Sequence, residues 1–124
     1  MLPSSAIDPA KAQTTPCMFV DTGVPALIQA VSDMSAQAGN ACGSAVAGAS
    51  RLIAKVAGAA SLLGGQGAFK IGERNYIVLR KLLEENHIQV AAEETGGTIA
   101  RTLYLYMSSG RTMIKALGKE RELA

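Results

Sequence analysis

The spacing of apolar residues in the first third of the chain is the strongest structural signal in the sequence. Apolar side chains recur at intervals of three and four, as on the buried face of an α-helix; they are Val24, Leu27, Ile28, Val31, Met34 and Ala38. Asp21 or Thr22 can cap the start, and Pro25 falls in the first turn, where its missing N–H costs nothing. Gly39-Asn40 accepts the left-handed conformation that ends a helix.

A second helix is expected from about Gly72 to Asn86, with Glu73 favouring its positive N-terminal end. Its buried stripe is expected to comprise Leu79, Leu82, Leu83 and either Tyr76 or Val78. Its solvated face is expected to carry Arg74, Arg80, Lys81, Glu84 and Glu85.

Strands are indicated by alternation and by short apolar runs. Residues 51–58 form the first, with one face made of Leu52, Ala54 and Val56, and 88–92 form the second. Residues 103–107 and 112–117 alternate on either side of the turn Ser108-Ser109-Gly110, which predicts a β-hairpin.

The remaining segments have the composition of loops. Three prolines predict a loop over 1–19, 41–49 is ambiguous, 59–67 is rich in glycine, and 119–124 is expected to be a frayed, charged tail. The order loop, helix, strand, helix, strand, hairpin predicts a mixed α/β fold in which two main helices flank the sheets.

Composition limits both the core and the partners. Hydrophobic residues make up 48% of the 124 residues but aromatic residues only 4%, so the core must use aliphatic side chains. Twelve basic and 10 acidic residues are too balanced for a nucleic-acid surface. The chain starts without a secretory signal, and 41–63 is too polar to span a bilayer. We therefore expect one soluble, cytoplasmic domain over 1–124.

Three residues could act as nucleophile, base or metal ligand: Cys17, Cys42 and His87. We expect two reduced thiols rather than a disulfide. His87 is expected at the C-terminal end of the second helix, where an imidazolium is favoured by the helix dipole. A Cys–His pair is the alternative, although nothing in the spacing predicts it. Three residues far apart in sequence do not make a zinc site, so we expect no metal.

The glycine-rich loop and the paired carboxylates have structural explanations. The glycines of 58–67 match neither GxGxxG nor GxxxxGK[ST], which favours a tight loop that a neighbouring strand or a peptide substrate can approach closely. Glu93 and Glu94 are adjacent at a strand end and should point to opposite faces. We expect a solvated strand end, or a partner for Arg74 or Arg101.

Several short segments occur in a characteristic order: Met1-Leu2-Pro3, Val20-Asp21-Thr22-Gly23, Ala54-Lys55-Val56-Ala57-Gly58 with Ala60-Ser61, Ile71-Gly72-Glu73-Arg74-Asn75, Ala92-Glu93-Glu94-Thr95-Gly96-Gly97, Arg101 and Ser109-Gly110. Taken together, they resemble the chemoreceptor glutamine deamidases of chemotaxis, the CheD family, over 1–118. The resemblance implies an α/β domain that hydrolyses receptor glutamine side-chain amides to glutamate and releases ammonia. It also implies a Cys nucleophile that forms a thioester, a His base and a Thr that orients the His, with no metal or organic cofactor.

The resemblance further implies two kinds of partner, which are methyl-accepting chemoreceptors and a response-regulator phosphatase of the CheC type. It suggests that Gly58, Ala60, Ser61, Arg74 and Asn75 bind substrate or support the site.

The sequence departs from the family pattern at the catalytic residues. The family's His comes two residues before the Met of Met-Leu-Pro, which here is Met1, so the catalytic Thr, Cys and His are expected upstream of it. Cys17, Cys42 and His87 lie outside the family's motifs, and Ala59 stands where the family usually has Gly. We expect that the start codon has been placed at an internal Met, or that the chain has been trimmed, so that N-terminal strands are missing. Their loss leaves the apolar faces of Leu52, Leu103 and Leu105 uncovered. The alternative is a degenerate relative that binds a chemotaxis phosphatase or receptor without chemistry.

Overall fold

The computed structural model describes residues 1–40, 52–61 and 70–124. Its elements, in chain order, are η1 (Ser5–Ile7), α1 (Pro9–Thr14), η2 (Pro16–Met18), α2 (Val20–Asn40), β1 (Ile53–Gly58), α3 (Ile71–Glu85), β2 (Gln89–Thr95), β3 (Thr102–Tyr106), β4 (Arg111–Ala116) and β5 (Lys119–Glu122). The predicted mixed α/β class is confirmed. The ambiguous segment 41–49, Cys42 and 62–67 of the expected loop lie outside the described residues.

The centre of the molecule is a β1–α3–β2 unit. β1 and β2 pair in parallel, from Ile53 opposite Gln89 to Gly58 opposite Thr95. A parallel pair needs a crossover connection, and α3 lies within it, with Leu83 and the following Ile88 buried. Both predicted strands and the second predicted helix are therefore confirmed, although β2 runs three residues further than expected.

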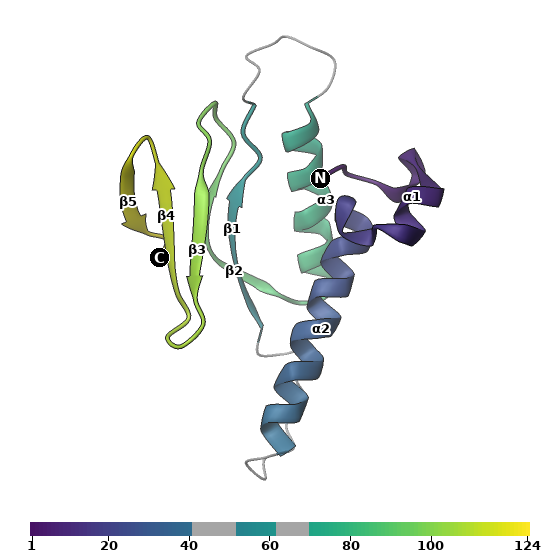
Figure 1. Ribbon diagram of the computed structural model, residues 1–124, viewed down its shortest axis with the longest axis horizontal. Coiled ribbons are helices and arrows are strands. Elements are labelled where there is room, and N and C mark those ends of the chain that lie inside the picture. The colour runs from purple at the N-terminus through teal and green to yellow at the C-terminus, as the bar shows by residue number, and fades with distance from the viewer. Residues whose placement is uncertain (41–51, 62–69) are drawn as a thin grey trace.

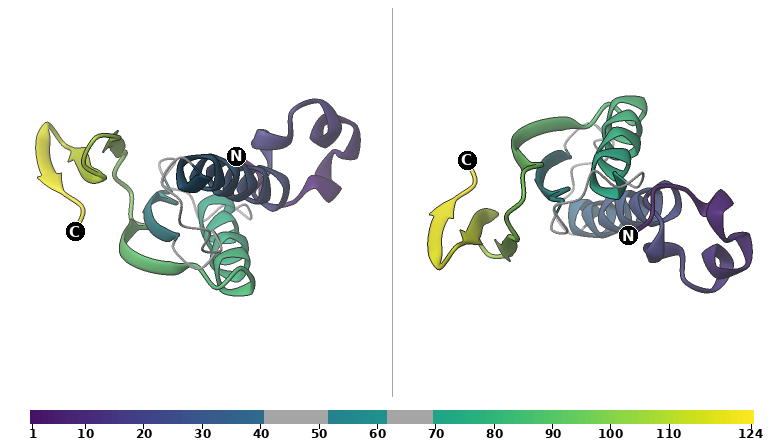
Figure 2. Two further views of the ribbon diagram at one scale, coloured as in Figure 1. Left: turned by 90° about the horizontal axis from the view of Figure 1, so that it is seen from below. Right: turned by 90° about the horizontal axis from the view of Figure 1, so that it is seen from above.

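The predicted hairpin is also confirmed and forms part of a second sheet, of order β3-β4-β5. Figures 1 and 2 show this sheet on one side of the β1–β2 pair and α2 with α3 on the other. Thr112, Ile114 and Leu123 are buried in it. β3 is exposed along its whole length, and Leu105 has 56% of its surface accessible. Leu103 and Leu105 are thus uncovered, as expected, whereas Leu52 is half-buried.

The expected frayed tail over 119–124 is wrong, because Lys119–Glu122 form β5. Leu117 and Gly118 both have positive φ values, 50° and 74°, which is the conformation of a two-residue hairpin turn. Oppositely charged side chains then face each other across the strands, with Lys115 Nζ 3.4 Å from Glu120 Oε1. Local charge predicted a solvated tail, but these cross-strand pairs and the burial of Leu123 hold it in the sheet.

The expected loop over 1–19 is wrong as well, because the prolines begin short helices instead of preventing them. Pro9 is the first residue of α1, where Asp8 caps the helix by accepting a hydrogen bond from Lys11 N at 3.0 Å. Pro16 is likewise the first residue of η2, although Thr15 makes no side-chain capping hydrogen bond there. Phe19, at the end of this region, is fully buried.

The first predicted helix is present as α2, but it begins earlier than predicted. Asp21 lies inside its first turn and accepts hydrogen bonds from Ser5 instead of capping the helix. Thr22 is inside the helix too, and its hydroxyl donates to Pro16 O at 2.6 Å. Pro25 is the sixth residue of α2, beyond the first turn, so it removes one intrahelical hydrogen bond.

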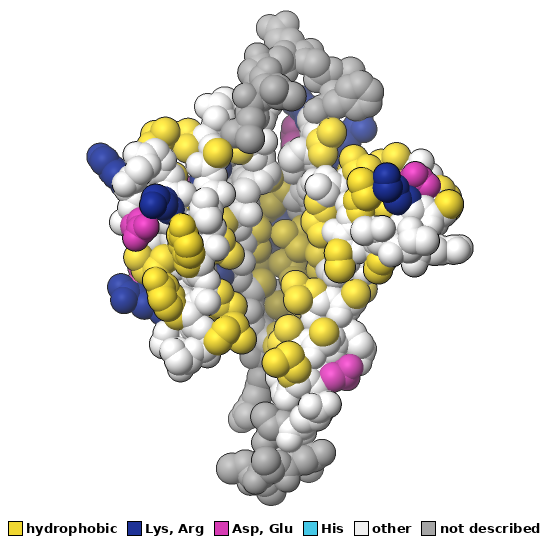
Figure 3. All heavy atoms as spheres, in the orientation of Figure 1, with side chains coloured by type: hydrophobic (Ala, Val, Ile, Leu, Met, Phe, Trp, Pro, Cys, Tyr) yellow, Lys and Arg dark blue, Asp and Glu magenta, His cyan; other side chains and the backbone are white. Residues whose placement is uncertain are grey.

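The predicted buried face of α2 is covered only in part. Val24, Ile28 and Val31 are half-buried, whereas Leu27 and Met34 are 62% and 63% exposed. The reason is that α2 packs against α3, and a single neighbouring helix covers a narrow stripe. Figure 3 shows hydrophobic side chains along α2 and in the hollow between it and the three-stranded sheet. Of the helices in the described ranges, none is both long and apolar enough to cross a membrane.

Candidate functional site

The β1–α3–β2 unit has one end at which loops and a helix N-terminus meet. Gly58 ends β1, Thr95 ends β2, and α3 begins at Ile71 on the same side (Figure 1). In α/β sheets with parallel strands, ligands bind beyond the carboxyl ends of the strands. This end of the unit is therefore the candidate site.

Two glycine turns are joined at this end. Gly96 N donates to Gly58 O and Ser61 N donates to Gly97 O, both at 2.8 Å. Gly58, Gly96 and Gly97 have positive φ values, and so does Ala59, at 55°. The hydrogen bonds fix the backbone of 58–61 against the end of β2, which explains why this loop needs residues that accept left-handed conformations.

The start of α3 touches the same loop. A Cβ atom on Gly72 would lie 2.6 Å from Ala59 O and 2.8 Å from Ala59 C, which is closer than such atoms approach. Glycine at 72 therefore permits a backbone-to-backbone contact that any side chain would prevent. The first turn of α3 is thereby locked onto 58–61.

Asn75 links α3 to the start of the chain. Its Nδ2 donates to Met1 O at 2.7 Å, across 74 residues of sequence, while its Oδ1 is buried without a hydrogen-bond partner. Leu2 forms a parallel β-bridge with Phe19, which places the first residues beside the start of α2. Met1 also lies against Gly23, whose Cβ position would be 3.2 Å from Met1 Cε.

The structure thus places all five predicted site residues at this end of the β1–α3–β2 unit. Gly58, Ala60 and Asn75 are half-buried at this end, and Ser61 is exposed there. Arg74 is exposed in the first turn of α3, and within the described ranges no hydrogen bond or ion pair of its side chain is present. The contact between Asn75 and Met1 was not foreseen, because no local pattern reports a pairing of residues so far apart.

Glu93 and Glu94 point to opposite faces of β2, as predicted. On the helix side, Glu93 Oε2 accepts a hydrogen bond from Tyr76 Oη at 2.8 Å and lies 3.6 Å from Arg80 Nη1. This hydrogen bond, followed by burial, raises the pKa of the Tyr76 phenol. Glu93 therefore fastens α3 to β2 and is committed to a structural contact.

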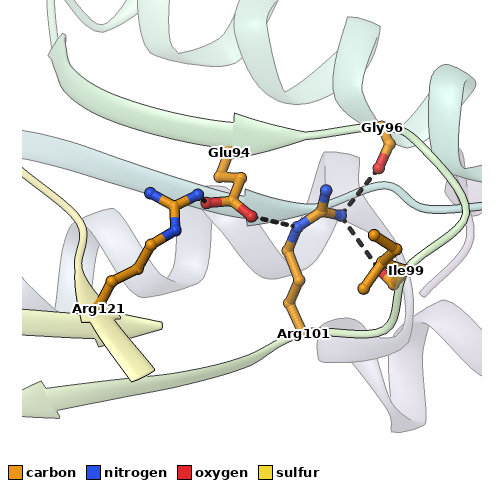
Figure 4. Close-up of polar contacts among 5 residues, drawn as sticks. All are labelled: Glu94, Gly96, Ile99, Arg101 and Arg121. Carbon is orange, nitrogen blue, oxygen red and sulfur yellow. Dashed lines mark hydrogen bonds and ion pairs between the residues drawn. The ribbon is translucent and has the colours of Figure 1, made fainter. Parts of the chain in front are cut away.

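Glu94 joins the two sheets on the other face (Figure 4). Its Oε1 accepts a hydrogen bond from Arg101 Nε at 2.8 Å, and its Oε2 pairs with Arg121 of β5. Arg101 also donates to the carbonyl oxygens of Gly96 and Ile99, at 2.8 and 3.2 Å. The predicted Arg101 partner is confirmed and Arg74 is not one, while Arg121 was missed because it lies in the supposed tail.

A local nucleophile–base pair is not built from Cys17 and His87. Cys17 is an exposed free thiol in η2, near Met1 and the start of α2. His87 follows the C-terminal end of α3, as predicted, with φ at 55°. It lies 12 residues beyond Asn75, which is about 18 Å along a helix axis. His87 is therefore at the opposite end of the β1–α3–β2 unit from the candidate site.

The described residues hold no cluster of three His, Cys, Asp or Glu side chains that could bind a metal ion. The carboxyl group of Asp21, in the first turn of α2, has a shifted pKa. Burial raises its pKa, but hydrogen bonds from Ser5 N, Ser5 Oγ and Ser4 together outweigh this, so the pKa lies below its usual value. Asp21 therefore stabilises η1 as a carboxylate, at the base of the segment that leads from Met1.

Comparison with known proteins gives one consistent result. The family described as "CheD chemotactic sensory transduction" matches residues 1–116. A protein of Solibacter usitatus named "Probable chemoreceptor glutamine deamidase CheD" is 45% identical over 123 residues, which is 99% of this chain and 66% of that protein. A similarly named protein of Syntrophus aciditrophicus is 37% identical, covering 95% of this chain and 67% of its own length. One of Anaeromyxobacter dehalogenans is 32% identical, covering 93% and 65%. The chain spans about two thirds of the length of these relatives.

Proposed function

The chain belongs to the CheD family, and on that premise we propose that it serves in a chemoreceptor glutamine deamidase of chemotaxis. The reaction hydrolyses the side-chain amide of selected receptor glutamines to glutamate and releases ammonia. The names of the relatives state this activity. We propose it for the protein that contains residues 1–124.

One observation carries this proposal. Segments that resemble the family, although scattered over the sequence, converge at one end of the β1–α3–β2 unit. The segment 58–61 is hydrogen-bonded to 96–97, α3 packs on it through Gly72, and Asn75 binds Met1. Motifs that served only to maintain the fold would be expected throughout the structure. These motifs instead lie at the carboxyl ends of parallel strands, where ligands bind.

The proposed chemistry is nucleophilic catalysis by a cysteine thiolate. The sulfur attacks the amide carbonyl, the C–N bond breaks, and ammonia leaves with a proton supplied by the His base. The resulting thioester is hydrolysed by water, which yields the glutamate carboxylate and regenerates the thiol. In this proposal the catalytic Thr, Cys and His are not Cys17, Cys42 or His87, and they come from outside residues 1–124. The distance of His87 from the candidate site supports this for the described residues.

Residues 1–124 supply the frame of the site in this proposal. Gly58, Ala60 and Ser61 shape the wall that receives the glutamine side chain, and Arg74 and Asn75 line or support it from α3. We propose that the chain forms a single cytoplasmic domain, uses no cofactor, and has chemoreceptors and a CheC-type phosphatase as its partners. The 124-residue chain on its own is then inactive.

The alternative function is binding without chemistry, to a chemotaxis phosphatase or to a receptor. It is favoured by one observation, which is that His87, beyond the C-terminal end of α3, lies at the opposite end of the β1–α3–β2 unit from the candidate site. A pull-down of the phosphatase or a receptor fragment by the 124-residue chain, with no ammonia released by any longer form, would support it.

The test is release of ammonia from a purified receptor fragment, together with mass spectrometry of the modified glutamines. We expect the full-length protein to add 1 Da per converted glutamine and the 124-residue chain to add nothing. A receptor fragment with Glu at the same positions is the matched control. The enzymatic proposal fails if the full-length protein releases no ammonia, and the assignment of inactivity fails if the short chain does.

A further inference from the structure

Asn75 lies where three segments meet, which are the start of α3, the loop 58–61 and the start of the chain at Met1. It lies one helical turn beyond Gly72, so the two residues share a face of α3, and Gly72 abuts the backbone of Ala59. From this face, Asn75 Nδ2 donates to Met1 O at 2.7 Å. The carboxamide therefore lies where the start of the chain passes the candidate site.

The second half of the carboxamide is unsatisfied. Asn75 Oδ1 is buried and has no hydrogen-bond partner among the described residues. Turning the amide over would place this oxygen against Met1 O, and two acceptors repel, so the orientation is fixed by chemistry. A buried, unpaired acceptor lowers the stability of the folded state, and an apolar side chain of the same size would avoid that loss. Asn75 is therefore a poor choice for stability alone.

The hydrogen bonds of Leu2 attach the start of the chain to the beginning of α2. Leu2 N donates to Met18 O and Val20 N donates to Leu2 O, both at 2.8 Å. These bonds leave the position of Met1 relative to α3 open. Within the described structure, Asn75 supplies the hydrogen bond that sets it.

We propose that Asn75 is a positioning residue, whose carboxamide holds the segment Met1-Leu2-Pro3 in place beside α3 and the loop 58–61. The role of the segment in turnover rests on the proposed function. A shift of about 1 Å in a supporting group can reduce catalysis about 100-fold, so a single hydrogen bond at this junction is enough to matter.

The experiment compares Asn75→Leu, Asn75→Asp and Asn86→Ala in the full-length protein. Asn86 is the matched control, because it caps the other end of α3 and its Nδ2 also donates to a backbone carbonyl, that of Leu82, at 2.8 Å. Three quantities are measured: kcat and KM on the receptor fragment, the midpoint of thermal unfolding, and hydrogen exchange at the Leu2 and Val20 amides.

Asn75→Leu is expected to lower kcat by about 10- to 100-fold with little change in KM. Its thermal midpoint should equal or exceed that of the wild type, because the unpaired acceptor is gone. Exchange at Leu2 and Val20 should become faster. Asn86→Ala should lower the midpoint while leaving kcat and both exchange rates unchanged.

Asn75→Asp provides a signature in pH. Its carboxylate cannot donate to Met1 O, but the protonated acid can. The ratio of kcat in this variant to kcat in the wild type should therefore rise as the pH falls from 8 toward 5.

The proposal is overturned if Asn75→Leu retains wild-type kcat, or if its exchange at Leu2 and Val20 matches the wild type. It is also overturned if the Asn75→Asp ratio does not change with pH. A wild-type protein that releases no ammonia refutes the proposed function separately, and the exchange rates still decide whether Asn75 holds the segment.

Discussion

Glu94 and Arg101 form the contact that ties the two sheets of the molecule together, with Arg101 Nε 2.8 Å from Glu94 Oε1. The two side chains are only 19% and 10% exposed, so this pair is better shielded from water than any other ion pair among the described residues, including that of Glu94 with Arg121, whose arginine is 62% exposed. Arg101 Nη1 also donates a hydrogen bond to Gly96 O, at 2.8 Å. The pair thus couples the sheet contact to the candidate site.

Removing Arg101 should be costly. Arg101→Met removes the more buried of the two arginines that pair with Glu94, and we expect a loss of about 2 kcal/mol in the free energy of unfolding. Denaturant unfolding measures this loss. Lys81→Met, which breaks the exposed pair with Glu85, serves as the control and should cost less than about 0.5 kcal/mol. Equal losses in the two variants would show that burial does not distinguish the pairs.

Gly72→Ala should destabilise the protein although alanine is the better helix former. The new Cβ would meet Ala59 O at 2.6 Å, and backbone atoms on both sides must move. Overpacking of this kind costs about 1–3 kcal/mol, which exceeds the gain of about 1 kcal/mol from helix propensity. Glu84→Ala on the exposed side of α3 should be nearly neutral. Thermal unfolding compares the two, and a stabilised Gly72→Ala protein would contradict the close contact.

Leu117→Asn should stabilise the β4–β5 turn. Leu117 has φ at 50° and is 79% exposed, so it bears conformational strain without gaining burial. Asparagine tolerates this conformation and precedes Gly118, as two-residue hairpins favour, so we expect a gain of about 1 kcal/mol. Gly118→Ala introduces a side chain into open space at φ 74° and should lose about 1 kcal/mol. If both substitutions changed the free energy of unfolding in the same direction, the positive φ values at 117 and 118 would not be what limits the stability of the turn.

Asp21→Asn should weaken the protein at neutral pH but not in acid. The pKa of Asp21 is lower in the folded chain than in the unfolded chain, so the unfolded state binds more protons in acid. The contribution of the charged group is therefore complete above an unfolded pKa of about 3.9 and is lost as the pH falls through the folded value.

We expect a difference of about 1 kcal/mol between wild type and Asp21→Asn at pH 7 and pH 5, which closes below pH 4. Urea unfolding across this range measures it. Asp33→Asn is the control, since Asp33 is exposed and accepts one side-chain hydrogen bond, from Gln29. A gap that persists at pH 3 would mean that the charge of Asp21 is not what stabilises the segment.

The periodicity of apolar residues was sufficient to predict the elements whose own sequence carries a clear helix or strand pattern. α3 has a full apolar stripe, and β1, β2 and the β3–β4 hairpin follow strand spacing, so all were predicted. It failed for α1 and β5, whose stability comes from caps and from partners in the fold. Proline composition predicts a loop at Pro9, yet this residue begins a helix. The charge of 119–122 predicts a solvated run, yet these residues pair with β4.

The resemblance proposed residues for the candidate site, but it did not predict their arrangement. Those residues are Gly58, Ala60, Ser61, Arg74 and Asn75, and the β1–α3–β2 unit places them at one end. The contact of Asn75 with Met1 and that of Arg121 with Glu94 join distant segments, and no short window of sequence contains them. The exposure of Leu27 and Met34 was unpredictable for the same reason, because the coverage of a helix face depends on what packs against it.

The 74-residue separation between Met1 and Asn75 sets the order of events during biosynthesis. A ribosome adds about 5–20 residues per second, so about 4–15 s pass between the synthesis of Met1 and that of its hydrogen-bond partner Asn75. The Gly58–Gly96 and Ser61–Gly97 hydrogen bonds form later still. A nascent chain that ends before residue 97 would contain α2, β1 and α3 but would lack the Gly96–Gly97 turn that fixes the loop 58–61. The candidate site is therefore among the last parts of residues 1–97 to be completed.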